Sequence, residues 1–205
     1  MAKKRGKKVG KTKKFSIIRE YKEILGYLKE SKKFIYTIIG VFLLFLLIGF
    51  FIPAPEYVYN QIIKFIQDIL AQTEGMTHFD LIAFIISNNV RSTLFGILFG
   101  FILGIFPLVS ALVNGYLLGF VSVATVNSGG FLILGKLFLY GVFELPAVFI
   151  SLGLGLKLGT FIFQKKKLEF FRNNLLNSLK VFLLIVIPLL IIAGIIEGTL
   201  MALNP

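Results

Sequence analysis

A run of 19 residues without a charged side chain, residues 34–52, limits the folds open to this chain more than any other feature. A helix of that length spans roughly 30 Å, the thickness of the hydrocarbon core of a bilayer. Comparable runs follow it, so hydrophobic residues make up 57% of the 205 residues and charged residues only 16%. Soluble domains are rarely so apolar. The sequence therefore predicts an integral membrane protein.

The apolar runs suffice for about five crossings, which must be helical because a single segment in lipid satisfies its backbone groups only within itself. The predicted crossings are residues 34–52, 89–106, 108–126, part of 131–163, and 181–200, with turns at Pro107 and at residues 127–130. Residues 81–86 are too short to cross. They form either a half-helix that dips into the membrane or the outer end of one tilted helix. We expect an all-α, polytopic membrane protein with two interrupted helices and amphipathic interfacial helices.

Amphipathic segments border the crossings. In residues 15–33, apolar side chains recur at helical spacing opposite a charged face, which is typical of a helix on the membrane surface. The predicted division is residues 1–33, a basic tail and amphipathic helix, and residues 34–205, a transmembrane domain. This domain includes an amphipathic outer loop at 53–80 and an inner interfacial helix at 164–180.

The distribution of basic residues predicts which side of the membrane each connecting segment faces. Of the 22 Lys and Arg residues, 13 precede Phe34, and residues 164–180 hold five more, whereas residues 53–80 carry four acids and one Lys. Basic residues mark the cytoplasmic side. We therefore expect a multi-pass protein of the cell membrane with its amino terminus in the cytoplasm and its carboxyl terminus outside. The basic residues 1–14, interpreted as part of an uncleaved anchor, are expected to contact anionic lipids rather than nucleic acid.

A polar group lies between two apolar runs at residues 87–93. It includes Arg91, and a cationic residue at the middle of a membrane helix costs about 2.5–3.5 kcal/mol on insertion scales and usually marks function. A second polar group, residues 141–146, contains Glu144. We hypothesise that Arg91 and Glu144 face one another in an intramembrane polar centre. The centre would comprise Asn88, Asn89, Arg91, Asn114 and Glu144.

Other interpretations of these charges stay open. The polar centre could be a network that holds the fold without any ligand, or residues 87–93 could lie at the interface and start a helix. Lys136, Lys157 and Glu197 are expected to reach the interfaces by snorkelling. The two polar groups also occupy corresponding places in two similar units, residues 81–126 and 131–200. This correspondence is compatible with a parallel internal repeat, in which Arg91 would align with Glu144, but apolar segments align with one another easily.

Glycines recur at intervals of four residues on several of the predicted helices. This spacing lets helix backbones approach closely in lipid. We predict packing within one subunit, with a homo-oligomer contact as the alternative. The glycines concerned are Gly96, Gly100, Gly104, Gly115, Gly119, Gly155 and Gly159.

No catalytic motif is present. The chain has no cysteine and a single histidine, and it lacks a Gly-x-Ser-x-Gly elbow, a His-Glu-x-x-His motif and a phosphate-binding glycine loop. We expect no cofactor, no metal and no enzymatic activity.

Three motifs occur in order between residues 34 and 200: Asn88-Asn89 before a glycine-rich helix, Asn114-Gly115-x-x-x-Gly119, and Gly141-Val-Phe-Glu144-Leu-Pro146-Ala147 with Gly153, Gly155 and Gly159. Together they resemble the stage II sporulation protein M family. The family often has Pro-His before its Gly-x-x-Glu element, where this chain has Leu139-Tyr140. The resemblance implies a polytopic membrane protein. The family is named for a member that works with cell-wall hydrolases during engulfment of the forespore, and many relatives occur in organisms that do not sporulate.

Two functions follow as expectations. The first is a non-enzymatic membrane scaffold that recruits membrane or envelope proteins through the outer loop and the basic inner surface. The alternative is a small transporter or channel component that uses the polar centre. Because five crossings are few for a complete transporter, this function would need the homo-oligomer.

Overall fold

The structure, a computed structural model, describes residues 17–129 and 131–203, so the basic tail and Gly130 of the predicted turn lie outside the described residues. Every element within these ranges is helical. In chain order they are α1 (Ile17–Phe51), α2 (Glu56–Thr73), α3 (His78–Leu98), η1 (Phe99–Phe101), α4 (Ile105–Gly129), α5 (Phe131–Gly159), η2 (Thr160–Phe163), α6 (Lys167–Val181), η3 (Phe182–Val186) and α7 (Ile187–Leu203).

In the part of the chain that the structure describes, five helical stretches are long and apolar enough to cross a membrane. They are Ile18–Phe51, His78–Phe101, Ile105–Val126, Gly141–Phe163 and Lys167–Leu203. The last one joins α6 to α7 through η3, a π-helical segment. The prediction of an all-α, polytopic membrane protein is confirmed.

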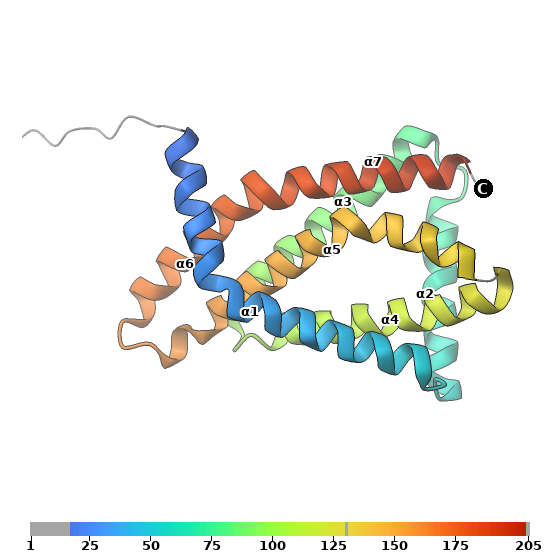
Figure 1. Ribbon diagram of the computed structural model, residues 1–205, viewed down its shortest axis with the longest axis horizontal. Coiled ribbons are helices and arrows are strands. Elements are labelled where there is room, and N and C mark those ends of the chain that lie inside the picture. Colours follow the sequence, from blue (N-terminus) through green and yellow to red (C-terminus); the bar gives the residue numbers. More distant parts are fainter. Residues whose placement is uncertain (1–16, 130, 204–205) are drawn as a thin grey trace, which may run out of the picture.

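Helix α5 is the centre of the bundle, because it packs against α1, α3, α4 and α7. The remaining spans form two pairs around it, α1 with α4 and α3 with α7. Figure 1 shows these helices side by side, while α2 crosses one end of the bundle near the carboxyl terminus. Helix α1 bends, so that its first part turns away from the direction of the spans (Figure 1).

Both stretches that were predicted as interruptions are helical. Helix α3 runs unbroken from His78 to Leu98, so residues 81–86 are the first part of one long helix. Helix α5 likewise continues through Pro146, although Figure 1 shows it changing direction along its length. Polar side chains need not break a helix when they bond to it. The Thr93 hydroxyl, for example, donates to the Asn89 carbonyl at 2.6 Å.

The turn between α3 and α4 lies earlier than Pro107, where the sequence placed it. The chain tightens into η1 and then reverses at Leu103 and Gly104, whose φ angles are 52° and 69°. These positive angles suit glycine and are uncommon for leucine. Pro107 falls in the first turn of α4, where its missing N–H removes no helical bond.

The seven glycines singled out in the sequence lie at contacts between helices of this one chain. A methyl group added at Gly100 would overlap the backbone of Gly155, and one at Gly155 would overlap the carbonyl of Gly96. Gly159 lies equally close to Gly104. On the other side of the bundle, Gly115 and Gly119 of α4 lie against the backbone of α1 at Phe42 and Leu46. Small residues thus let α5 approach α3, and α4 approach α1.

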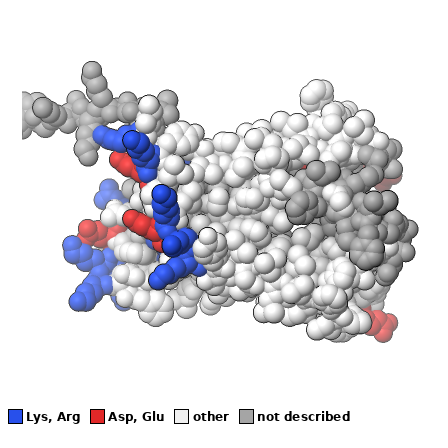
Figure 2. Space-filling view, viewed as in Figure 1, with Lys and Arg blue, Asp and Glu red and all other residues white. Residues whose placement is uncertain are grey.

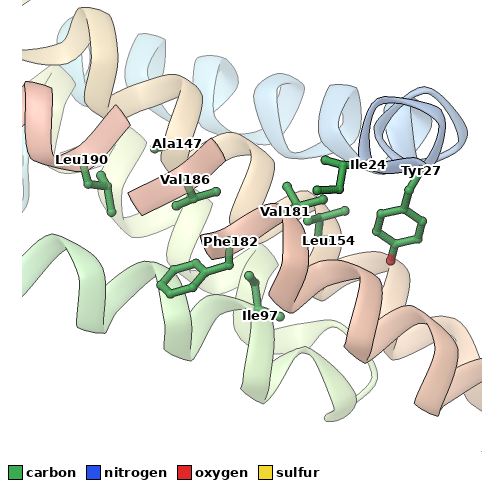
Figure 3. Close-up of a cluster of buried hydrophobic side chains, with 9 residues drawn as sticks. All are labelled: Ile24, Tyr27, Ile97, Ala147, Leu154, Val181, Phe182, Val186 and Leu190. Carbon is green, nitrogen blue, oxygen red and sulfur yellow. The ribbon is translucent and has the colours of Figure 1, made fainter. Parts of the chain in front are cut away.

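A core of buried apolar side chains joins α1, α3, α5, α6, η3 and α7 (Figure 3). It consists of Ile24, Tyr27, Ile97, Ala147, Leu154, Val181, Phe182, Val186 and Leu190. Ile24 and Tyr27 belong to the amphipathic part of α1, whereas Ile18, Tyr21 and Leu25 of the same part are exposed. This part of α1 therefore closes the bundle with one face and leaves a second apolar stripe free to meet a membrane surface.

Charged side chains gather at one end of the molecule. In the face shown in Figure 2, Lys and Arg cluster over the first part of α1 and over the α5–α6 connection, and the spans are nearly free of charge. We call this the basic end. The opposite end, crossed by α2, is called the α2 end.

Candidate functional site

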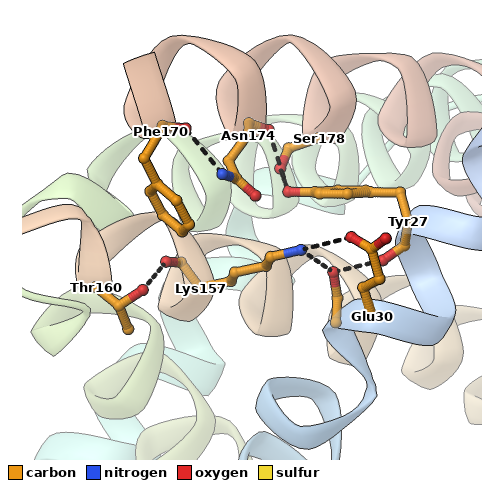
Figure 4. Close-up of polar contacts among 8 residues, drawn as sticks. Tyr27, Glu30, Lys157, Thr160, Phe170, Asn174 and Ser178 are labelled. Carbon is orange, nitrogen blue, oxygen red and sulfur yellow. Dashed lines mark hydrogen bonds and ion pairs between the residues drawn. The ribbon is translucent and has the colours of Figure 1, made fainter. Parts of the chain in front are cut away.

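A buried polar cluster at the basic end joins α1, α5 and α6 (Figure 4). We define this Lys157 cluster as Tyr27, Ser31, Lys157, Asn174 and Ser178. Lys157 is only 7% exposed, although it is a cation near the end of α5. Such a group is costly to bury unless neighbouring atoms replace its hydration.

Three groups on α1 surround the ammonium of Lys157. Its Nζ donates to the Ser31 hydroxyl at 3.0 Å and lies 3.9 Å from the centre of the Tyr27 ring. The Glu30 carboxylate is 3.9 Å away but largely exposed. Ser31 in turn donates to the Tyr27 carbonyl at 2.7 Å. The cation is thus held by a hydroxyl, an aromatic face and a loose ion pair.

The Tyr27 hydroxyl connects the α1 part of the Lys157 cluster to α6. It donates to the Asn174 carbonyl at 3.2 Å and lies 3.0 Å from the Ser178 hydroxyl. The side-chain amide of Asn174 donates to the Phe170 carbonyl at 2.8 Å. Further out, Lys180 of α6 bonds to Glu20 of α1 at 2.6 Å. The cluster and this ion pair fasten the first part of α1 onto α6.

Sequence reasoning missed this cluster. Lys157 was expected to snorkel to an interface, but its ammonium points toward Tyr27 and Ser31 of α1 and is buried there. A signal was available: Tyr27 and Ser31, like Asn174 and Ser178, are four residues apart and so share a helix face. The bend in α1 that brings the two faces together was not visible in the pattern.

The five residues of the predicted polar centre belong to three helices, α3, α4 and α5. Asn88 and Arg91 are exposed, and Asn89 and Glu144 are half-buried. Asn114 is exposed, and its amide donates to the Ser110 carbonyl of its own helix at 2.8 Å. Among the residues that the structure describes, no side-chain hydrogen bond or ion pair joins any two of the five.

Glu144 of α5 has a second carboxyl group near it, that of Glu197 on the neighbouring helix α7. Both are half-buried. Within residues 17–129 and 131–203, neither forms an ion pair. The side chain of Lys136 lies outside the described residues. At the start of α3, the His78 ring nitrogen Nε2 lies 3.2 Å from the Thr199 hydroxyl of α7.

Two surface grooves mark the two ends. At the α2 end, an almost wholly apolar groove of about 310 Å³ runs between α2 and α4; it is lined by Tyr57, Val58, Gln61, Ile62, Phe65, Val113 and Leu117. At the basic end, a groove of about 640 Å³ lies between the α5–α6 connection and α6. In the described part of the chain, no group of three or more His, Asp or Glu side chains could hold a metal ion.

Within the described residues, five apolar helices, of which four pack around the fifth, α5, define a multi-pass α-helical membrane protein. More specifically, the chain belongs to the stage II sporulation protein M family, since the family model described as Stage II sporulation protein M matches residues 38–200. That match includes Lys157, Asn174 and Ser178 but begins after Tyr27 and Ser31. No curated protein and no solved structure matches the chain.

Proposed function

We propose that this protein is a non-enzymatic membrane scaffold, which recruits other membrane or envelope proteins through α2. The observation that carries this proposal is the low burial of α2. Ile62 is its one buried residue, while the large apolar side chains of Tyr57, Phe65 and Leu70 are exposed. Tyr57 and Phe65 also line the apolar groove beside α4. A helix that presents aromatic residues next to a groove has the composition of a protein-docking surface.

The scaffold would hold its basic end in the cytoplasm and α2 outside. The gathering of Lys and Arg at the basic end supports this orientation. Since the chain has no cysteine, single introduced cysteines report orientation without background. In intact cells, a membrane-impermeant maleimide should label Glu74→Cys beside α2, and Lys166→Cys at the basic end only after permeabilisation. The reverse labelling would contradict the orientation.

Photocrosslinking in cells tests recruitment. A photoreactive amino acid placed at Tyr57 or Phe65 should give a discrete adduct with a second protein, whereas the same amino acid at Gln67, an exposed polar position on another side of α2, should not. The adduct should copurify with the full chain after mild extraction. Equal crosslinking from all three positions, or no protein adduct and no copurifying partner, would overturn the scaffold function.

Transport is the second candidate, because Glu144 and Glu197 place two half-buried carboxyl groups on neighbouring spans. Ionisable groups within spans often belong to ion pathways. In proteoliposomes, ion or solute flux should then be lost in Glu144→Gln protein that keeps its melting temperature. Wild-type flux no greater than that of empty vesicles would contradict transport and leave the scaffold function as the better account.

A further inference from the structure

We propose that the groove at the basic end binds the phosphate-containing head group of an anionic phospholipid. The groove lies where α5 ends and α6 begins, and it has a volume of about 640 Å³. That is within the range of cavities that bind small molecules. Its lining is mixed: polar side chains from the connection and from α6, and the apolar rings of Phe163 and Phe170. The inference is independent of the proposed scaffold function, which concerns the other end of the molecule.

The charges in the groove fit an anion. Lys165 and Lys166 both line it. Lys166 lies 3.0 Å from Glu169, so the one carboxylate of the groove is already neutralised by its own partner. Lys165 has no ion-pair partner within the described ranges. The groove therefore keeps one uncompensated positive charge.

Unused hydrogen-bond donors support the same ligand. Gln164 and Asn173 line the groove, and the side-chain amide of neither bonds to any other residue described in the structure. An amide N–H donates well to a phosphate oxygen, and charge-assisted bonds of this kind are stronger than neutral ones. These two amide residues and Lys165 come from both sides of the groove, the α5–α6 connection and α6, and their donors match the several acceptor oxygens of a phosphodiester.

The surroundings of the groove favour a lipid over a soluble anion. The groove lies between the ends of two candidate spans, Gly141–Phe163 and Lys167–Leu203, and therefore at the level of the membrane interface. On its borders, the side chains of Phe163 and Leu168 are 81% and 82% exposed. Apolar groups beside a cationic site suit acyl chains below a head group, and a free phosphate would gain nothing from them.

The groove also adjoins the Lys157 cluster. Asn174 lines the groove, and its carbonyl accepts the Tyr27 hydroxyl of α1. Phe170, a second lining residue, accepts the Asn174 amide. A head group bound here would contact the same turn of α6 that holds α1. Binding to the folded protein would consequently raise its stability.

The experiment measures thermal unfolding of the full-length protein in a neutral detergent while phosphatidylglycerol is added. The variant is Lys165→Gln/Lys166→Gln. The matched control, Lys32→Gln/Lys33→Gln, removes the same charge from exposed positions of α1 outside the groove. Phosphatidylglycerol should raise the melting temperature of the wild type, and phosphatidylcholine should not. Its apparent affinity should fall at least tenfold in the groove variant, given that each basic residue near a membrane surface contributes about 1 kcal/mol, and less than threefold in the control.

Two results would overturn the site: equal weakening in both variants, which would indicate general attraction by the basic end, and a full shift with inorganic phosphate alone, which would indicate a soluble anion. A second variant, Gln164→Leu/Asn173→Leu, keeps every charge and tests the groove independently if the first variant fails to fold. It should also bind phosphatidylglycerol severalfold more weakly. Unchanged affinity in this variant would contradict the role of the groove.

Discussion

The two ends of the molecule are built differently. At the basic end, α1 and α6 are tied through buried polar groups, with Lys157 enclosed by Ser31 and Tyr27. At the α2 end, α2 buries Ile62 and leaves most of its apolar residues exposed. Buried polar networks fix one arrangement because partial satisfaction is costly, whereas exposed apolar side chains can accept different neighbours. The basic end is therefore held in one arrangement by specific contacts, whereas α2 leaves most of its apolar surface exposed.

The largest loss is expected from Gly155→Leu. The added side chain would overlap the backbone at Gly96, which cannot move without displacing α3 from α5. We expect more than about 3 kcal/mol of destabilisation, at or above the usual cost of overpacking. The matched control is Gly40→Leu, an exposed glycine of α1 with no atom near its added Cβ. Thermal unfolding in detergent measures both; equal stability would show that the α3–α5 contact is not as close as described.

Reversal of the buried charge comes next. Lys157→Glu would place a carboxylate beside Glu30 and remove the donor to Ser31. Leaving a buried charge unpaired costs about 3–5 kcal/mol. Lys32→Glu, the same change at an exposed site of α1, should change the free energy of unfolding by less than about 0.5 kcal/mol. Thermal unfolding measures both variants. Similar losses of stability would show that the buried Lys157 contributes no more to the basic end than an exposed lysine does.

A smaller effect is expected from Tyr27→Phe, which keeps the ring over Lys157 and deletes the hydroxyl that reaches Asn174 and Ser178. Loss of these bonds should cost about 1–2 kcal/mol. It should also speed hydrogen exchange in the first part of α1, because fewer bonds would hold it to α6. Tyr36→Phe, at a largely exposed tyrosine of the same helix, is the control and should change neither quantity.

The smallest effect on stability is expected at the α2 end. Phe65→Ser should change the free energy of unfolding by no more than about 0.5 kcal/mol, because the ring is already half exposed. The same variant should reduce copurification of any partner captured from Tyr57. A large loss of stability would show that the contacts of α2 stabilise the fold as strongly as those of the basic end. The contrast between the two ends would then fail.

The fold could be predicted further than the site. Hydrophobic length alone locates the five spans, and glycine spacing points to the surfaces where α5 meets α3. Polar contacts depend on how helices rotate and bend. Arg91 and Glu144 were paired from their positions along the chain, yet α3 turns Arg91 outward. On a helix that is apolar nearly all round, periodicity does not tell which face meets a neighbour. The Lys157 cluster required the bend in α1, and that bend has no sequence marker such as a proline.

The central place of α5 sets an order of assembly. Chains are synthesised from the amino terminus, so α1 and α4 can pack together before α5 exists. Helix α3 has no such opportunity: its contact with α4 is slight, and its main neighbours, α5 and α7, are made last. During synthesis, α3 with its cationic Arg91 therefore remains without its main packing partners until α5 and α7 have been made. The insertion of α5 is then the step that turns separate spans into one bundle.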